Sequence, residues 1–468
     1  MSNALAWVKK NLMIVIFSVI IVAVLPAGFV MSRSWGEQVR SKQEKAANAE
    51  MGKVTSASVE YTLPQFEPGA QGVSLRTEPN DSLTAWFREK REALNAQAAD
   101  IVKRASDFNK GVGREAAALG RREHTPLIDG IFPSFAAGTD PSQKLFEFED
   151  ALLGKRGRPD PFRSMLVRAR ADAPVDPIRL AETLRDMETR ETEKIKGAIS
   201  RELTPEERSR LSQALLERRL GEYRMRAAEI SFYASPDLFP TGTGDSTGRP
   251  TETELNQLSR EGEAKRVLWF FVYQWDLWTY EDILDAVRVA NRGGESSGVE
   301  GSVVKRIEKI TLKRPEGLLG SAPIVGDASR ANLDPLTGEI MAPTAAVAGM
   351  VPTDPNVSIT GRAGASWNPM YDVRRASMTA VVSSARLNEF VAAIHRTNFM
   401  TVTDLDASPV DVYEDLREGY YYGAEHVVRV KVEIECVYLR SWMTSIMPSI
   451  VKELMGIKPP PTDEGGQG

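Results

Sequence analysis

The residue types that most often do chemistry in proteins are sparse in this 468-residue chain. It has three histidines, His124, His395 and His426, and no two of them stand at the spacing that metal sites use. Its single cysteine, Cys436, excludes an internal disulfide. Cys436 also falls on the apolar phase of a predicted strand, which favours a buried small hydrophobe over a reactive thiol. We therefore expect no zinc enzyme, no metal and no cofactor.

Two further segments have compositions that could bind a ligand. The first is an acidic group between Asp404 and Asp415, and clustered carboxylates attract Ca²⁺. Pro409 interrupts this group and the mid-loop glycine of an EF-hand is missing, so we interpret it as a solvated hairpin loop. The second is the segment from Thr241 to Pro250, TGTGDSTGRP, which follows no predicted strand and lacks the Lys-Ser/Thr pair of a phosphate loop. We interpret it as a turn.

Catalytic serine motifs are equally weak. Ser449 and Lys452 have the Ser-x-x-Lys spacing, but they lie in a predicted terminal helix without companion motifs, and no Gly-x-Ser-x-Gly elbow is present. We therefore predict that the protein is not an enzyme. An enzyme whose polar side chains converge only in the folded chain is a third alternative.

The most pronounced element is the uncharged apolar run from Leu12 to Val30, LMIVIFSVIIVAVLPAGFV. Because about 20 apolar residues cross a bilayer once, the run predicts a single-pass transmembrane helix after a cytoplasmic tail at 1–11. A cleaved secretory signal is the alternative, but Leu25 stands where a cleavage site has a small residue. Basic residues flank the run on both sides, so the positive-inside rule mildly disfavours export of the residues that follow it. We nevertheless place the bulk of the chain in the periplasm, because a short N-terminal anchor commonly leads export.

Composition excludes one class of partner. The formal net charge is −5, and no patch of lysine and arginine is interleaved with aromatic residues. We therefore expect no nucleic-acid binding. The length outside the anchor is sufficient for two or three domains with cores of their own.

Residues 31–118 are predicted to form a helical stalk, with an irregular stretch from Thr55 to Asn80. Asp81 or Ser82 then caps a helix that runs to about Lys110. Its apolar residues recur every seventh position, at Phe87, Leu94, Ile101 and Phe108. This interval is typical of a coiled-coil seam, so the four are candidate interface residues, and a plain amphipathic helix is the alternative.

The region from 119 to 240 predicts helices and no convincing strand. Its clearest signal is Thr204 with Glu207, a capping box, and Pro205 fits the first helical position between them. The helix that follows is highly charged with a narrow apolar stripe. Such a helix is better suited to packing on partners than to enclosing a pocket.

A second capping pair, Thr251 and Glu254, begins a predicted helix that continues to Asn291. Four of its aromatic residues are further candidate interface residues: Trp269, Tyr273, Trp275 and Trp278. They lie on more than one side of the helix, which suggests burial on more than one side. This cluster is interpreted as domain core, with a protein interface as the alternative.

The strands are concentrated after this helix. They are predicted at Val303–Leu312, Tyr371–Val382, Phe399–Leu405 and His426–Leu439. In the last, apolar and charged residues alternate, so one face is buried and one is wet, as a helix-covered antiparallel sheet requires. A helix headed by Ser383 or Ser384 separates the second and third strands, and a final helix spans Ser441–Met455. A long loop at 315–368 and a disordered tail at 457–468 complete the chain.

The order of elements in 251–456 is helix, strand, strand, helix, strand, strand, which predicts an α+β domain with a permuted ferredoxin-like (αββαββ) arrangement. Together with the anchor and stalk, this layout resembles the PilO-type proteins of type IV pilus assembly and the GspM-type proteins of type II secretion. The resemblance rests on element order, with no fixed motif. The helical region at 119–240 and the loop at 315–368 depart from the pattern.

The resemblance implies a non-enzymatic bitopic scaffold of the inner membrane. Such a protein forms homo- or heterodimers through its stalk and C-terminal domain, and it links cytoplasmic motor components to other envelope-assembly proteins. The alternative is a membrane-anchored extracytoplasmic ligand-binding or sensory module, in which the loop at 315–368 and the aromatic helix frame a ligand site.

Overall fold

The computed structural model describes residues 7–8, 11–55, 58–63, 73–78, 80–197, 201–292, 298–315, 318–319, 370–455 and 457. The predicted loop at 315–368, the tail at 457–468 and the tail at 1–11 lie mostly outside these residues. The chain divides into two compact units, Met1–Ile101 and Val102–Gly468.

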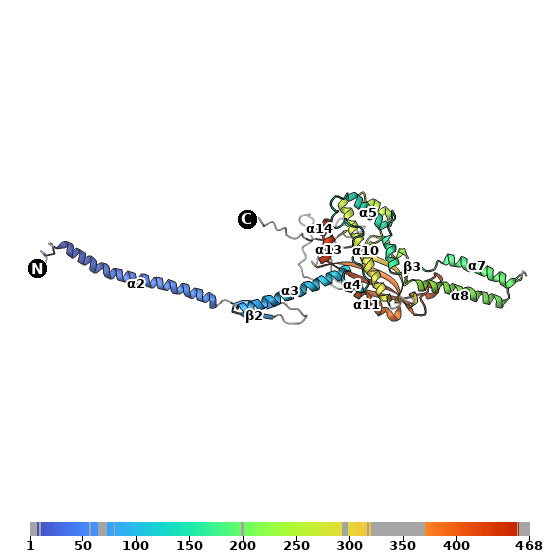
Figure 1. Cartoon of the computed structure of the whole chain (residues 1–468), viewed down its shortest axis with the longest axis horizontal. Helices are drawn as coiled ribbons and strands as arrows, with labels where there is room; N and C mark the ends of the chain where they lie inside the picture. The colour runs from blue at the N-terminus through green and yellow to red at the C-terminus, as the bar shows by residue number, and fades with distance from the viewer. Residues whose placement is uncertain are drawn as a thin grey trace, which may run out of the picture. The chain divides into compact units, whose positions relative to one another are not determined.

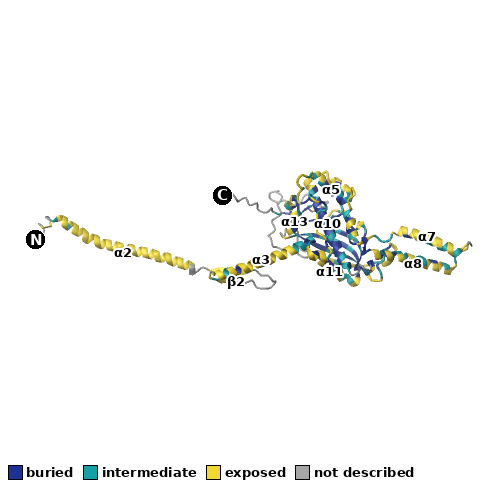
Figure 2. Cartoon of the chain, viewed as in Figure 1, coloured by how far each residue is buried: buried dark blue, intermediate teal, exposed yellow. Residues whose placement is uncertain are grey.

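The first unit contains the predicted apolar helix. Helix α2 (Leu12–Thr55) includes the whole apolar run and continues through Pro26 into the polar residues beyond it. Among the described residues it is the one helix long and apolar enough to cross a membrane, and none of its most apolar window is buried (Figure 2). It is therefore compatible with a membrane anchor or a signal sequence.

A β-hairpin occupies part of the stretch that was predicted to be irregular. Strands β1 (Val59–Leu63) and β2 (Val73–Thr77) pair antiparallel, and Tyr61 stands opposite Leu75. The cap of helix α3 (Asp81–Lys110) also differs from the prediction, because the Asn80 Oδ1 atom accepts a hydrogen bond from the Leu83 amide at 3.1 Å. Asn80 therefore caps this helix, as expected of a residue just before the first turn.

The second unit is built on a mixed sheet with the strand order β3-β4-β6-β7-β9-β8, and β5 pairs with the other edge of β6. The four long strands are β6 (Val304–Lys313), β7 (Tyr371–Ser383), β8 (Met400–Pro409) and β9 (Val427–Leu439). Each pairs antiparallel with its neighbour, which confirms the four predicted strands. Strand β8 extends through Asp404 and Asp406, so the prediction of a hairpin loop there was wrong.

Three very short strands were not predicted. They are β3 (Ala171–Asp172), β4 (Phe232–Tyr233) and β5 (Ser246–Thr247). Strand β3 pairs parallel with β4, and β4 pairs parallel with β6. The region at 119–240 thus contributes two strands to the sheet, and a two-residue strand is too short to leave a periodic signal.

The helices of the second unit begin with clear local signals. They are α4 (Gly113–Ala118), α5 (Pro141–Leu153), α6 (Pro161–Arg168), α7 (Pro177–Lys196), α8 (Pro205–Glu229), α9 (Glu252–Leu258), α10 (Glu263–Asn291), α11 (Leu387–Thr397), α12 (Val412–Arg417), α13 (Arg440–Ile446) and α14 (Ser449–Leu454). Three of them start at an Asp-Pro pair, in which Asp140, Asp160 or Asp176 accepts hydrogen bonds from the first-turn amides. The aspartate supplies the cap and the proline has no amide that needs a partner. The capping boxes at Thr204 and Thr251 are both present, as predicted.

Three predicted helices differ in their ends. The helix predicted from Thr251 to Asn291 is interrupted before Gly262, which precedes α10, and glycine is a poor helix former. The terminal helix is divided at Pro448, because proline disfavours helical geometry in the residue before it. Neither Ser383 nor Ser384 caps α11, which follows the short 3₁₀ turn Ser384–Arg386 without a side-chain cap.

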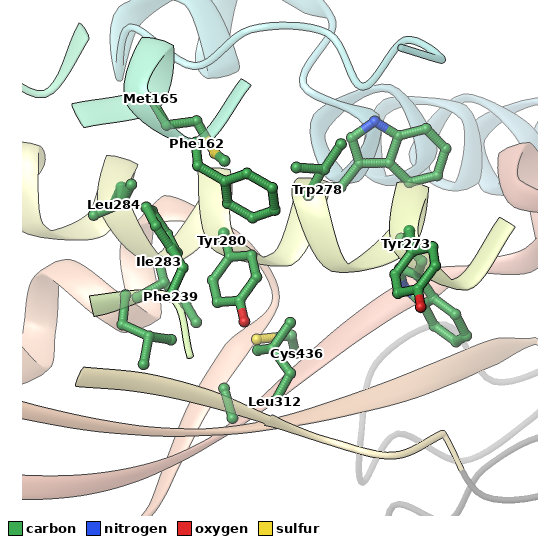
Figure 3. Close-up of a cluster of buried hydrophobic side chains, with 14 of the residues drawn as sticks. Phe162, Met165, Phe239, Tyr273, Trp278, Tyr280, Ile283, Leu284, Leu312 and Cys436 are labelled. Carbon is green, nitrogen blue, oxygen red and sulfur yellow. The ribbon is translucent and has the colours of Figure 1, made fainter. Parts of the chain in front are cut away.

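Helix α10 lies between two layers. Figure 3 shows Phe162 and Met165 of α6 on one side of it, and Leu312 and Cys436 of the sheet on the other. One hydrophobic cluster extends from Ile128 to Met455, so the residues at 119–240 and at 251–456 share a single core. The prediction that this aromatic helix is buried on more than one side is confirmed.

Helices α7 and α8 lie side by side as an antiparallel hairpin of two mostly exposed helices (Figures 1 and 2). Within α7 only Leu180 is buried, and within α8 the buried residues are Leu211, Tyr223 and Ala227. This narrow seam agrees with the charged, thinly apolar helix that the sequence predicted.

Candidate functional site

The eight candidate interface residues separate into different environments. Trp275 and Trp278 are each 1 % exposed and belong to the core. Phe87 is buried against Tyr61, with the ring centroids 5.1 Å apart. Ile101 is 60 % exposed.

Three of the remaining candidates are half-buried: Leu94, Phe108 and Trp269. The Phe108 ring lies 5.7 Å from that of Phe399. Trp269 and the buried Tyr273 together line a cavity.

This cavity, which we call the aromatic pocket, has a volume of about 230 Å³. Its walls come from the 242–248 loop, α9 and the first turns of α10. Its lining includes Glu254, Gln257, Glu261, Trp269, Tyr273 and Arg314. The rings of Trp269 and Tyr273 are 5.6 Å apart at an angle of 37°, as expected of residues four positions apart on one helix face.

The loop that forms one wall is a tight turn, as the sequence predicted. The Ser246 amide donates to the Thr243 carbonyl at 2.7 Å, and β5 then pairs with the end of β6. A Cβ atom on Gly248 would lie 2.0 Å from the Pro240 carbonyl oxygen, so the turn requires glycine there. The glycines of this loop thus serve close backbone packing.

The charged groups around the aromatic pocket have partners, although the Arg314 Nε atom has none within the described residues. Arg314 donates to the Leu319 carbonyl at 3.0 Å, and its guanidinium carbon lies 5.5 Å from the Trp269 ring centroid. Glu254 accepts the Thr251 amide in the capping box, and Glu261 forms an ion pair with Lys265.

The Tyr273 hydroxyl, in contrast, makes no hydrogen bond within the described part of the chain, although the residue is only 7 % exposed. Burial raises the pKa of Tyr273, and the nearby carboxylates of Glu254 and Asp276 raise it further, so the phenol stays protonated. It is therefore an uncharged donor and acceptor without a partner.

A second group of polar side chains is fully enclosed in the second unit. We call it the junction cluster: Asn109, Arg121, His124, Asp282 and Asn398. Asp282 accepts hydrogen bonds from Arg121 at 2.8 Å, from Asn398 at 2.7 Å and from the Tyr438 hydroxyl at 3.2 Å, and it also contacts His124 at 3.2 Å. Each of the five residues is at most 5 % exposed.

Asn109 connects the last turn of α3 to this cluster. Its amide nitrogen donates to Asn398 Oδ1 at 2.9 Å and to the Val437 carbonyl at 2.8 Å. Its oxygen accepts from the Leu439 amide at 2.8 Å and from the Trp442 indole at 2.7 Å. All four hydrogen-bonding positions of this side chain are therefore satisfied.

Charge neutralisation holds the junction cluster together. Burial alone would raise the pKa of Asp282, but the charges of His124 and Arg121 outweigh it and hold that pKa well below its usual range. Asp282 is therefore an anion in a dry environment, and its partners keep it there. Within the described part of the chain, Asp282 is bonded to Arg121, His124, Asn398 and Tyr438, and none of these is a serine or cysteine.

The other residues that the sequence singled out do not converge. Cys436 is 1 % exposed and burial raises its pKa, which makes it a poor thiolate. Asp404 lies on β8 and Asp411 caps α12. Ser449 begins the short helix α14. Within the described residues, no group of three or more His, Cys, Asp or Glu side chains could hold a metal ion.

Sequence reasoning missed the junction cluster and the pocket for a physical reason. The partners of Asp282 are 116 to 161 residues away from it along the chain, and no local pattern records such contacts. A usable signal did exist, because Asp282 is a charged residue on a helix that is otherwise apolar over most of its surface. Such a residue needs a buried partner.

Comparison with known proteins found no matching family model, no matching curated protein and no matching solved structure.

Proposed function

We propose that this protein is a non-enzymatic, bitopic membrane scaffold of a type IV pilus or type II secretion-like envelope assembly. The anchor is the apolar part of α2, the stalk is the predicted segment 31–118, and the part of the second unit that follows it is the docking domain. The bulk of the chain lies in the periplasm.

The observation that carries the proposal is the strand order β6-β7-β9-β8, together with the single exposed apolar helix found in the described part of the chain. If β9 were placed before α10, the series would be β-α-β-β-α-β, which is the ferredoxin-like order. In this rearranged series β9 would be the first strand and β7 the third. These two are the central strands of the antiparallel part of the sheet. This supports a permuted ferredoxin-like domain, which the PilO-type and GspM-type layout also implies.

The stalk residues support a role in pairing. Ile101 is exposed and Leu94 is half-buried, so the middle of the seven-residue repeat is open to a partner helix. Within the second unit, the junction cluster fixes the last turn of α3 to β9 through Asn109. A load that reaches this turn would thus be passed to the sheet through hydrogen bonds that are shielded from water.

Crosslinking in intact membranes tests the proposal. Cysteine pairs are introduced by Ile101→Cys and Leu94→Cys in a Cys436→Ala background, because Cys436 is the single native cysteine. We expect a disulfide-linked dimer of the chain or a crosslinked envelope protein. The matched control is Val102→Cys, which is exposed but lies off the seven-residue repeat.

Two results would contradict the scaffold. A chain that stays monomeric and recovers no envelope partner would remove the docking role. A topology reporter fused after Gly468 that reads cytoplasmic would exclude the periplasmic body.

The aromatic pocket favours a second candidate, a membrane-anchored extracytoplasmic ligand-binding module. Its support is a cavity with an unpartnered hydroxyl at Tyr273, a feature that a purely structural core does not need.

A further inference from the structure

We propose that the aromatic pocket binds one uncharged saccharide ring. The inference rests on the pocket and is independent of the scaffold role. Drug-sized ligands occupy pockets of roughly 300–1,000 Å³. The cavity here, at about 230 Å³, is smaller and therefore suits one ring of a glycan and not several.

The aromatic wall supplies the apolar half of the recognition. Aromatic rings carry a negative face, and the C–H groups on one side of a sugar ring carry small positive charges, so the two pack favourably. Trp269 is half-buried and Tyr273 is tilted by 37° against it. Together the two rings form an angled surface that borders the cavity.

The polar half comes from groups that have spare hydrogen-bonding capacity. The Tyr273 hydroxyl has no partner among the described residues, and the exposed Gln257 amide makes no side-chain hydrogen bond there. A hydroxyl both donates and accepts, and an amide offers both functions at one end. Sugar hydroxyls need this mixture, whereas an apolar ligand would leave the Tyr273 hydroxyl unsatisfied.

Charged ligands fit the aromatic pocket less well. A phosphate would face Glu254 and Glu261, and Arg314, the single lining cation among the described residues, already donates to the Leu319 carbonyl. An ammonium ion would meet the positive charge of Arg314 over the Trp269 ring. A neutral polyol avoids both conflicts.

The experiment measures ligand binding to the full chain in detergent by saturation-transfer NMR. The probes are N-acetylglucosamine and glucose, with choline and inorganic phosphate as charged comparisons. We expect saturable binding of at least one sugar with a Kd on the order of 1–10 mM, and no saturable binding of choline or phosphate. Saturable binding of a charged probe with no sugar binding would overturn the proposal.

A matched pair of variants on α10 isolates the pocket. Tyr273→Phe removes a hydroxyl from a residue that lines the cavity, whereas Tyr280→Phe removes a buried hydroxyl without a hydrogen-bond partner from a residue that does not line it. We expect Tyr273→Phe to weaken sugar binding about fivefold to tenfold and Tyr280→Phe to leave it unchanged. Gln257→Ala, at an exposed position, gives a second test that does not disturb the core.

Equal binding by the wild type and by both Tyr273→Phe and Gln257→Ala would refute the assignment. Failure of sugar binding together with successful stalk crosslinking would remove the pocket proposal and leave the scaffold in place.

Discussion

The two long apolar helices, α2 and α10, satisfy their side chains in opposite ways. Over the apolar run at 12–30, α2 has no charged residue, and none of its most apolar window is buried in the protein. Helix α10 buries most of its residues, yet it also buries Asp276, Asp282 and Asp285. Thus no described part of the chain covers the most apolar window of α2, whereas most side chains of α10 are packed inside the second unit.

The contrast leads us to expect that charge is tolerated in α10 and not in α2. Each buried carboxylate of α10 has a cation from another element beside it: Arg374 at Asp276, Arg121 at Asp282 and Arg168 at Asp285. A membrane offers no such partner. Substitutions that change charge should therefore have different consequences in the two helices.

The largest effect is expected for charges placed in α2. On insertion scales each aspartate at a helix centre costs roughly 2.5–3.5 kcal/mol, so Ile20→Asp with Val24→Asp should prevent stable insertion. We expect the double variant to move from the carbonate-resistant membrane fraction to the soluble fraction. Ile20→Leu with Val24→Leu is the control and should stay with the membrane. A double aspartate variant that remains in the membrane fraction would show that α2 is not the anchor.

The next effect concerns the opposite change, removal of a charge from α10. Asp282→Asn keeps the shape of the side chain but leaves the Arg121 guanidinium buried without an anion, and breaking a buried pair costs roughly 3–5 kcal/mol. Chemical unfolding of the second unit at pH 7 measures this loss. Asp406→Asn, at an exposed position of β8, is the control and should change stability little.

The pH dependence of this difference has a defined sign. The pKa of Asp282 is lower in the folded chain than in the unfolded chain, where aspartate titrates near about 3.9. Its stabilisation is therefore fully present above that value and is lost as the pH falls below it. The gap between wild type and Asp282→Asn should narrow below about pH 4. A gap that stays constant down to about pH 3 would contradict the charge assigned to Asp282.

The sequence predicted those features whose signal lies within one short segment of the chain. The alternation in β7 and β9, the capping boxes at Thr204 and Thr251, and the apolar run of α2 are local patterns, and each was found where expected. The Asp-Pro starts of α5, α6 and α7 were equally local and could have been used.

The remaining features depend on contacts between distant segments. The hydrogen bond from Asn109 to Val437 joins residues 328 positions apart, and strand β4 pairs with β6 through only Tyr233 and Arg306. The aromatic pocket likewise needs Arg314 beside Trp269. The sequence identified its aromatic members but contained no pattern that places a cavity next to them.

The smallest expected effect belongs to the α7–α8 hairpin, which neither a membrane nor a core surrounds. Helix α8 starts with the Thr204 capping box, and Glu207 also pairs with Arg201, whose hydrogen bond is the main reason that its pKa falls to about 2. Thr204→Ala should cost about 1 kcal/mol, and hydrogen exchange should show faster opening in the first turns of α8.

The matched variant Thr251→Ala removes an identical box from α9, whose Leu255 and Leu258 belong to the core. Because α9 unfolds with the core and the hairpin can open alone, Thr251→Ala should lower the global Tm while Thr204→Ala should leave it nearly unchanged. Equal shifts in Tm would show that the hairpin is as much a part of the cooperative core as α9 and α10.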